Sequence, residues 1–317
     1  MARKEAVALN DEVRQRLTGL DLTARSLVEG LPGGLHRSPF HGFSVEFAQH
    51  REYTWGDELR HVDWKVWGKT DRYYVKQYEE ETNLAAHFLL DGSESMLYAG
   101  EKASGGRSKY EYGALCAVAM AHLLLRQRDA VGLVLFDNEV RARVPPSSNP
   151  GTMRLLVDEI AKVEQRAETD VAGLFHQLSE EVPRRGLVVL ISDCFVPRAE
   201  LLDGLSRLRH RRHEVVVVHV LDGDELEFPF EDNTMFRGLE STGELLTEPR
   251  SLRDSYRDAV REFVAAVNGG CTERRVDYVL MRTDEPPEVA LSRFLVRRAS
   301  GGARGSVGAA GPEGIAR

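Results

Sequence analysis

The chain has 317 residues, of which 42% are hydrophobic and 29% are charged, which suits one large folded domain with a smaller attachment, or two ordinary domains. Its formal net charge of −8 argues against nucleic acid as the main partner, because that binding relies on clustered Lys and Arg. The three cysteines lie far apart without a Cys-x-x-Cys pair, which is typical of reduced thiols and suggests neither disulfides nor zinc.

Residues 1–34 are predicted to form a helical N-terminal segment. Apolar residues recur among charges from residue 5 to residue 31, as in one or two amphipathic helices, and the Leu31-Pro32-Gly33-Gly34 sequence ends the segment. It lacks the apolar core of a signal peptide, and the longest uncharged apolar stretch of the chain, residues 112–125, is too short to span a bilayer. We therefore expect a cytoplasmic protein without a membrane span.

Residues 35–83 form an aromatic-rich segment that contains all three tryptophans, Trp55, Trp64 and Trp67, interleaved with charges. Neither helical nor strand periodicity persists in it until residues 73–78, which are predicted to be a strand. The favoured interpretation is that the tryptophans pack while neighbouring Arg and Asp side chains pair with each other. The alternative is a docking surface for a partner, formed by Arg51, Asp57, Arg60, Asp63 and Lys65.

Residues 84–298 alternate between predicted strands and helices. The strands are expected at 85–90, 131–136, 140–144, 187–191, 215–221 and 275–281, with the third antiparallel at an edge because the Asp137-Asn138 turn is tight. The helices are expected from 109 to 125 after a capping box of Ser108 and Glu111, and at about 150–163, 170–182, 198–209, 251–267 and 287–297. This alternation predicts an α/β fold with a doubly wound, mostly parallel sheet.

The structures of two further segments, residues 222–232 and the C-terminal tail, are predicted from composition alone. An acidic segment at 222–232 is expected to be a solvated loop, with contact to a basic partner as the alternative. The tail, residues 299–317, is rich in Gly and Ala and is expected to be disordered.

Polar side chains of one chemical kind stand at three junctions of the predicted sheet. The Asp91-Gly92-Ser93-Glu94-Ser95 loop follows the strand at 85–90, Thr169 precedes the helix at 170–182, and Ser192-Asp193 follows the strand at 187–191. Ligands of open parallel sheets bind at the carboxyl ends of the strands, so we expect these side chains to converge. The predicted metal ligands are Asp91, Ser93, Ser95, Thr169 and Asp193.

Two carboxylates and three hydroxyls are hard oxygen ligands, which suit Mg²⁺ or Mn²⁺ and not zinc. Water at an open position of such an ion is replaceable by a partner's carboxylate, which is binding without bond breaking. Each residue also has a structural interpretation: Ser93 and Ser95 suit the cap of a turn, Thr169 suits a helix N-cap, and Asp193 suits a turn. No Gly-x-Ser-x-Gly elbow and no Gly-x-x-x-x-Gly-Lys-Ser/Thr motif occurs, so neither an esterase nor an ATPase is predicted.

The loop at 91–95, with Thr169 and Asp193, resembles the metal-ion-dependent adhesion site of von Willebrand factor A domains. The aromatic-rich segment resembles the signature of the bacterial family called domain of unknown function 58, and the resemblance extends over roughly residues 35–221. It is carried by Gly42, Glu46-Phe47, Arg51-Glu52-Tyr53, Gly56-Asp57, Arg60, Val62-Asp63-Trp64-Lys65, Tyr74-Val75-Lys76 and Glu79.

This resemblance implies a function in protein assembly. Members of the family are typically encoded beside MoxR-type AAA+ ATPases, which implies joint action in assembling or activating other proteins, and no enzymatic activity is established for them. Many relatives carry transmembrane helices ahead of the signature, whereas the N-terminus here is polar. We therefore expect a cytoplasmic adaptor, and not an enzyme, whose Mg²⁺ site captures a carboxylate on a MoxR-type ATPase or on its client. The alternatives are a metal-dependent phosphoester hydrolase, in which Asp91 and Asp193 hold the ion, and a scaffold without metal.

Overall fold

The computed structural model describes residues 16–17, 19–30, 46–55, 62–70, 72–79, 84–162, 180, 182, 185–231, 234–237, 244–247 and 249–299. Several predicted features lie outside these residues: Asp57, Arg60, Thr169, the side chain of Lys65, most of the helix at 170–182 and nearly all of the tail. The chain divides into two compact units, one made of Met1–Pro39 with Ala85–Arg317 and the other of Phe40–Leu84. We call the first the α/β unit and the second the aromatic unit.

The α/β unit is built on a six-stranded sheet in the order β10-β7-β6-β3-β4-β5. All neighbouring strands are parallel except β4 and β5, which are antiparallel. The strands are β3 (Ala85–Asp91), β4 (Ala130–Phe136), β5 (Val140–Ser147), β6 (Leu187–Ser192), β7 (Glu214–Leu221) and β10 (Asp277–Arg282). The chain leaves β3 for β4 on one side and later returns to β6 on the other, so the strand order reverses at β3. The doubly wound, mostly parallel sheet and its antiparallel edge strand are therefore confirmed.

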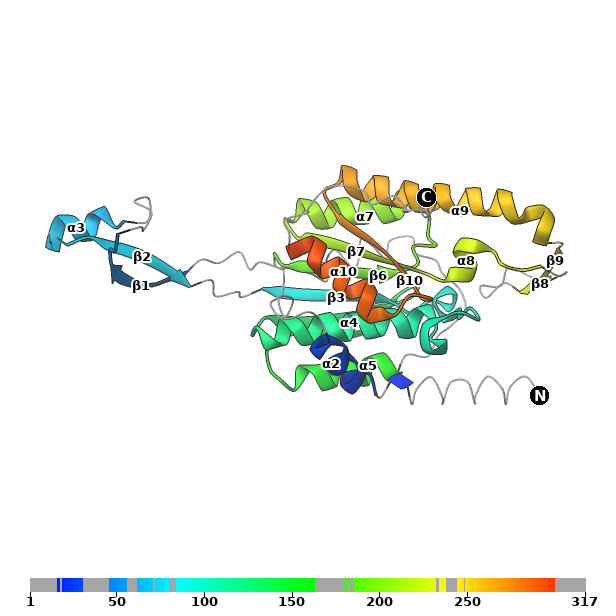
Figure 1. The fold of residues 1–317 in the computed structure, drawn as a ribbon, viewed down its shortest axis with the longest axis horizontal. Coiled ribbons are helices and arrows are strands. Elements are labelled where there is room, and N and C mark those ends of the chain that lie inside the picture. The colour runs from blue at the N-terminus through cyan, green and yellow to red at the C-terminus, as the bar shows by residue number, and fades with distance from the viewer. Residues whose placement is uncertain are drawn as a thin grey trace, which may run out of the picture. The chain divides into compact units, whose positions relative to one another are not determined.

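Helices cover both faces of this sheet. In Figure 1, α2, α4 and α5 lie on one side of the strands, whereas α7 and α9 lie on the other. The helices of the unit are α2 (Leu20–Glu29), α4 (Lys109–Arg126), α5 (Thr152–Lys162), α7 (Arg198–His210), α8 (Gly223–Glu227), α9 (Pro249–Glu273) and α10 (Pro287–Ala299). A short antiparallel pair that the sequence did not predict, β8 (Thr234–Arg237) with β9 (Glu244–Thr247), precedes α9. Among the described residues, no helix combines the length and the apolar character needed to cross a lipid bilayer.

The central strands are buried because they are covered on both faces. Every residue of β6 is buried, as the continuous apolar sequence of this strand predicts. The capping box at the start of α4 is present: the Ser108 side chain accepts a hydrogen bond from the Glu111 N–H, and Glu111 accepts one from the Ser108 N–H. Gly113 brings α4 close to the sheet, since a Cβ there would lie 2.8 Å from Cγ2 of Ile191. The start of α4 is thereby held against the end of β6.

The aromatic unit contains the antiparallel strands β1 (Glu46–Glu52) and β2 (Tyr74–Glu79), with α3 (Trp64–Thr70) between them in the chain. The favoured prediction for this segment is that its tryptophans pack, but within the described part of the unit they are not buried: Trp55 is 101% exposed, Trp64 58% and Trp67 38%. Trp67 stacks on Tyr73, and Trp64 meets Trp67 edge to face, so these rings cluster on the surface. The physical reason is that the described part of this unit, two strands and one short helix, provides no second layer to cover them.

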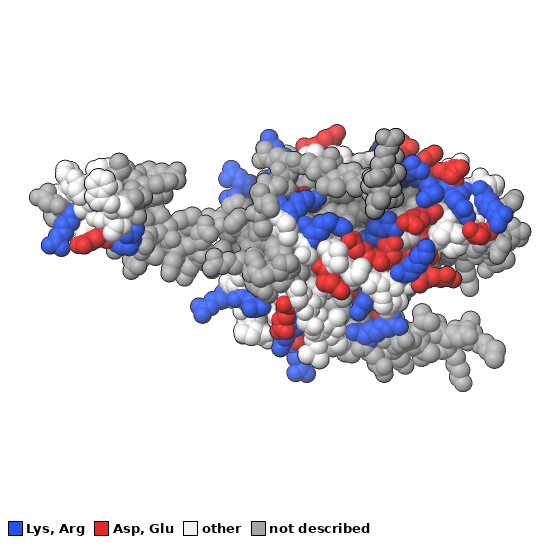
Figure 2. Space-filling model, in the orientation of Figure 1, with Lys and Arg blue, Asp and Glu red and all other residues white. Residues whose placement is uncertain are grey.

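The predicted docking residues of the aromatic unit have different environments. Asp63 is buried and accepts a hydrogen bond from the Val66 N–H at 3.3 Å, as a residue that caps α3 does. Arg51 donates to the Glu52 carbonyl at 3.3 Å and to the Thr54 hydroxyl at 2.9 Å. Asp63 is therefore structural, whereas Arg51 lies on the same unit as the exposed rings. On the face drawn in Figure 2, the described basic and acidic side chains of the α/β unit are intermixed.

Candidate functional site

The predicted metal loop begins at the last residue of β3. Asp91 is only 4% exposed, and its Oδ1 accepts a hydrogen bond from the Ser93 N–H at 2.9 Å. This bond folds the loop back on itself, and the hydroxyl oxygens of Ser93 and Ser95 lie 3.1 Å apart. The short 3-10 helix η2 (Glu94–Leu97) follows immediately. The structure thus brings three of the five predicted ligands together on one loop.

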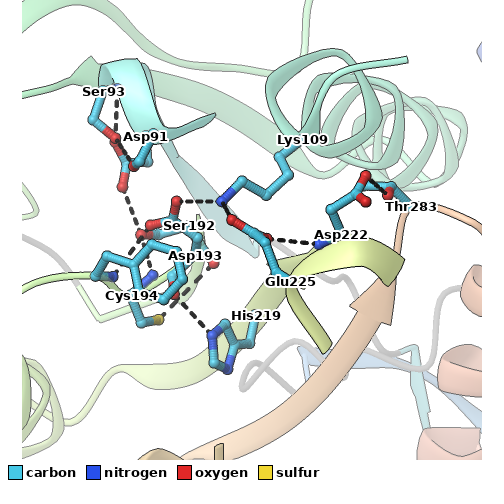
Figure 3. A network of polar contacts seen from close by, with 12 residues as sticks. Asp91, Ser93, Lys109, Ser192, Asp193, Cys194, His219, Asp222, Glu225 and Thr283 are labelled. Carbon is cyan, nitrogen blue, oxygen red and sulfur yellow. Dashed lines mark hydrogen bonds and ion pairs between the residues drawn. The ribbon is translucent and has the colours of Figure 1, made fainter. Parts of the chain in front are cut away.

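The loop is tied to the neighbouring strand by Ser192 at the end of β6. The Ser192 hydroxyl donates to Oδ2 of Asp91 at 2.5 Å, and it also accepts a hydrogen bond from the Cys194 N–H at 2.9 Å. Asp193 follows, is 1% exposed, and accepts a hydrogen bond from the Phe195 N–H at 3.2 Å through Oδ1. Figure 3 shows Asp91, Ser93 and Asp193 on the same side of the network. The carboxyl ends of β3 and β6 therefore place a fourth predicted ligand beside the loop, whereas Thr169 lies outside the described residues.

Lys109, which the sequence analysis did not select, holds the other oxygen of Asp193. It is the first residue of α4, its side chain is fully buried, and its Nζ lies 2.8 Å from Oδ2 of Asp193. The same Nζ lies 2.6 Å from Oε1 of Glu225 on α8 and 4.7 Å from the centroid of the Phe195 ring. Burial alone lowers the pKa of Lys109, but Asp193 and Glu225 outweigh it and hold that pKa above its usual value. Lys109 is therefore a buried ammonium shared by two carboxylates.

Among the described residues, no Lys or Arg forms an ion pair with Asp91, whose carboxylate accepts hydrogen bonds from Ser93 and Ser192 instead. Burial, and after it the negative charge of Asp193, raise the pKa of Asp91 to about 7, although the hydrogen bonds from Ser192 and Ser93 oppose the rise. The carboxylate form of Asp91 is thus disfavoured by its surroundings. A cation bound beside Asp91 would remove this penalty, because it favours the charged form.

His219 and Cys194 support the backbone at Asp193. His219 is buried; its Nε2 lies 2.8 Å from the Asp193 carbonyl oxygen and its Nδ1 lies 2.7 Å from the Tyr278 hydroxyl. Burial lowers the pKa of His219 to about 4, so the ring is neutral at pH 7. Cys194 is buried with a φ of 57°, a conformation that normally favours glycine. Its side chain belongs to the hydrophobic core of the α/β unit.

The prediction that residues 222–232 form a solvated loop is wrong for its first half. Asp222 is 1% exposed: its Oδ2 accepts hydrogen bonds from the Gly100 N–H at 3.0 Å and from the Thr283 hydroxyl, while its Oδ1 accepts one from the Asp224 N–H at 2.9 Å. Asp222 and Glu225 also form the capping box of α8. These carboxylates are buried because they satisfy the N–H groups of a helix start and of a loop.

The donor set at this edge of the sheet fits a hard divalent cation. Among the described residues, no three His, Cys, Asp or Glu side chains form a metal cluster, so an ion here would depend on two carboxylates and on hydroxyls. Asp91, Ser93, Ser95 and Asp193 are such oxygens, and Asp91 is short of positive charge. Mg²⁺ and Mn²⁺ suit this set.

The sequence contained partial signals for the residues that were missed. The capping box of Ser108 and Glu111 placed Lys109 at the first turn of a helix, and Asp222 with Glu225 has the same spacing. Neither pattern indicates that Lys109, Asp193 and Glu225 meet, because these residues are far apart in the chain. Only the folded sheet brings them together.

Fold and site together define an α/β domain with a candidate cation site at the carboxyl edge of a doubly wound sheet. A model of the protein family described as "Protein of unknown function DUF58" matches residues 49–265, which is more than half of the chain. The protein therefore belongs to the DUF58 family, and the resemblance found in the sequence is confirmed.

Relatives and solved structures extend this comparison. The uncharacterized protein Rv1480 of Mycobacterium tuberculosis is 26% identical over 299 residues, covering 91% of this chain and 90% of its own. The structure of BatB from Bacteroides thetaiotaomicron has a TM-score of 0.45 at 16% identity, covering 68% of this chain and 99% of that one. The SpRpn10 VWA domain has a TM-score of 0.39 at 14% identity, covering 71% of this chain and 99% of that one. These identities are too low to transfer a function.

Proposed function

We propose that this protein is a Mg²⁺-dependent protein-binding adaptor of the cytoplasm, in which the metal loop captures a carboxylate on a protein partner. The observation that carries the proposal is the position of Asp91, Ser93, Ser95 and Asp193 at one edge of the sheet, with no ion pair to Asp91 among the described residues. Following the family resemblance, the proposed partner is a MoxR-type AAA+ ATPase or a client of it.

The residues of the loop and of its surroundings would have different roles in such a site. Asp91, Ser93, Ser95 and Asp193 would hold the ion, and Ser192 orients Asp91 through its 2.5 Å hydrogen bond. When bound, Mg²⁺ or Mn²⁺ would supply an electrophilic position for an incoming carboxylate. Phe195 is 43% exposed beside Asp193 and offers an apolar contact next to that position. A partner with an acidic side chain beside an apolar one fits this arrangement best.

The aromatic unit provides a second surface for the same partner. Its rings at Trp64, Trp67 and Tyr73 are exposed and in contact with one another, and exposed aromatic clusters are typical of protein-binding surfaces. Their exposure supports the docking alternative for this segment over the packing interpretation. Arg51 lies on the same unit, and we include it in the proposed surface together with Lys65, Asp57 and Arg60.

Hydrolysis of a phosphoester is less well supported than binding. A hydrolase needs a group that transfers a proton, and His219, which lies beside Asp193, has both ring nitrogens engaged and is buried. Lys109 is engaged as well, by two carboxylates. These engagements favour a function in which no bond is broken.

The test is capture of partners by immobilised full-length protein, in Mg²⁺ and in EDTA, with Asp91→Asn as the matched variant. Asparagine keeps the size of Asp91 and an oxygen for the Ser93 N–H but removes the charge. We expect an AAA+ ATPase or its client to be retained only by the wild type in Mg²⁺. Equal retention in EDTA and by Asp91→Asn would contradict a metal-dependent adaptor, and Mg²⁺-dependent phosphatase turnover lost in Asp91→Asn would replace it by the hydrolase.

A further inference from the structure

Lys109 occupies a position where a cation is unfavourable unless something compensates it. It is the first residue of α4, where the positive end of the helix dipole repels a positive charge, and its side chain is fully buried. A buried ammonium is stable only when it is paired and hydrogen-bonded. Its partners are Asp193 at 2.8 Å and Glu225 at 2.6 Å. The position of Lys109 therefore depends on these two carboxylates.

The two oxygens of Asp193 are both engaged in this arrangement. Oδ1 accepts the hydrogen bond from the Phe195 N–H, and Oδ2 faces the ammonium of Lys109. A divalent cation that draws on Oδ2 of Asp193 must share that oxygen with Lys109 or displace it, and one that binds the remaining lone pair of Oδ1 still lies close to the ammonium charge. In the part of the chain that the structure describes, Asp91 forms no ion pair, so the positive charge of Lys109 is directed to Asp193 and not to Asp91.

We propose that Lys109 is a tethered counter-ion that competes with the divalent metal for Asp193. In the absence of metal it neutralises Asp193 and, through Glu225, joins the end of β6 to α8. When metal binds, the ammonium of Lys109 remains paired with Glu225 on α8, and Asp193 is then available to coordinate the ion. The competition weakens metal binding, so occupancy would respond to the metal concentration. This inference rests on the proposed metal-dependent function.

Glu225 also connects the site to a neighbouring loop. Its Oε2 accepts a hydrogen bond from the Asp222 N–H at 2.8 Å, and Asp222 in turn holds the Gly100 N–H. A Cβ at Gly100 would collide with the side chain of Asp222, so this close approach requires glycine. Lys109 thus belongs to a buried network that runs from Asp193 through Glu225 to Asp222, shown in Figure 3.

The test compares calorimetric titrations of Mn²⁺ and of Mg²⁺ into the full-length wild type, Lys109→Met and Lys109→Arg. Methionine keeps the length of the side chain without its charge, whereas arginine keeps the charge. We expect Lys109→Met to bind metal on the order of tenfold more tightly or better, because a unit charge close to the ion is removed. Lys109→Arg should stay close to the wild type. Lys162→Met, on the exposed α5 pair with Glu159, is the control and should change nothing.

A second variant keeps the test valid if Lys109→Met folds poorly. Lys109→Met with Glu225→Gln removes the ion pair as a unit and leaves Asp193 free for the metal. Tighter binding in either variant, with detectable binding in the wild type, supports both the inference and the proposed function. Binding in the variants alone supports the inference and contradicts the function. Equal or weaker binding than the wild type overturns the inference and leaves the function standing, and absence of binding in all proteins overturns both.

Discussion

The metal loop of the α/β unit and the exposed rings of the aromatic unit show opposite relations between residue type and burial. Around the loop, charged residues such as Lys109 and Asp222 are buried. In the aromatic unit, Trp55 and Trp64 are exposed. The difference shows that burial follows available partners and layers, and not residue type alone: a charge is buried where its hydrogen bonds are satisfied, and a tryptophan stays exposed where no second layer covers it.

Disruption of the buried carboxylate network at Asp222 should cause the largest loss of stability. Asp222→Ala removes the acceptor for the Gly100 N–H, the Asp224 N–H and the Thr283 hydroxyl. Each buried donor left unsatisfied costs about 1–3 kcal/mol, so we expect a loss of about 3 kcal/mol or more in urea unfolding. Glu231→Ala, in the same acidic segment but exposed, is the control and should stay within about 0.5 kcal/mol of the wild type. Equal effects of the two substitutions would show that Asp222 is solvated after all.

The buried histidines should make the α/β unit sensitive to acid. Burial lowers the pKa of His87 from 6.5 to about 4, helped by the positive charges of His213 and Arg143. The unfolded chain therefore takes up a proton as the pH falls below 6.5 while the folded state resists it until about pH 4, so stability falls across this range. At pH 5 the cost is about 2 kcal/mol for His87 relative to pH 7.5.

Urea unfolding of the wild type and of His87→Gln at pH 7.5 and at pH 5 measures the contribution of His87 to this loss of stability. The variant should lose about 2 kcal/mol less between pH 7.5 and pH 5 than the wild type does. His210→Gln, at an exposed position on α7, is the comparison. An unchanged pH dependence in His87→Gln would mean that the buried ring is not the source.

Relief of the backbone strain at Cys194 should change the free energy of unfolding by a smaller amount than the preceding substitutions. Its φ of 57° is strained for any residue with a Cβ, so Cys194→Gly should be about 1 kcal/mol more stable than Cys194→Ala, although glycine buries less apolar surface. Thermal unfolding of the two variants, both lacking the thiol, measures the difference. Greater stability of the alanine variant would exclude strain at this position.

Removal of an exposed ring of the aromatic unit should have the smallest effect on stability. Trp55 is 101% exposed, so Trp55→Ala should change the free energy of unfolding by no more than about 0.5 kcal/mol. In urea unfolding followed by circular dichroism, a loss of several kcal/mol would show that the ring is covered in solution. That result would restore the packing interpretation of the aromatic unit.

Most of the α/β sheet could be predicted from the sequence because its strands are short apolar runs separated by amphipathic helices. The loop at Asp91 and the acidic residue at Asp193 were identified from their positions at strand ends. The pairing of Lys109 with Asp193 and Glu225 could not be predicted, since it depends on which strand ends become neighbours in space. The exposure of Trp64 and Trp67 within their unit could not be predicted, because composition indicates aromatic content and not the number of layers available to cover it.

Thermal unfolding of the wild type and Asp91→Asn in EDTA, Mg²⁺ and Mn²⁺ tests the central claim most directly. A ligand that binds only the folded state stabilises it by about 2.7 kcal/mol at a hundredfold excess over its dissociation constant. The proposed site predicts a metal-dependent rise in the melting temperature of the wild type that is absent in Asp91→Asn. No shift in either protein at millimolar metal would contradict the metal site and favour a scaffold without metal.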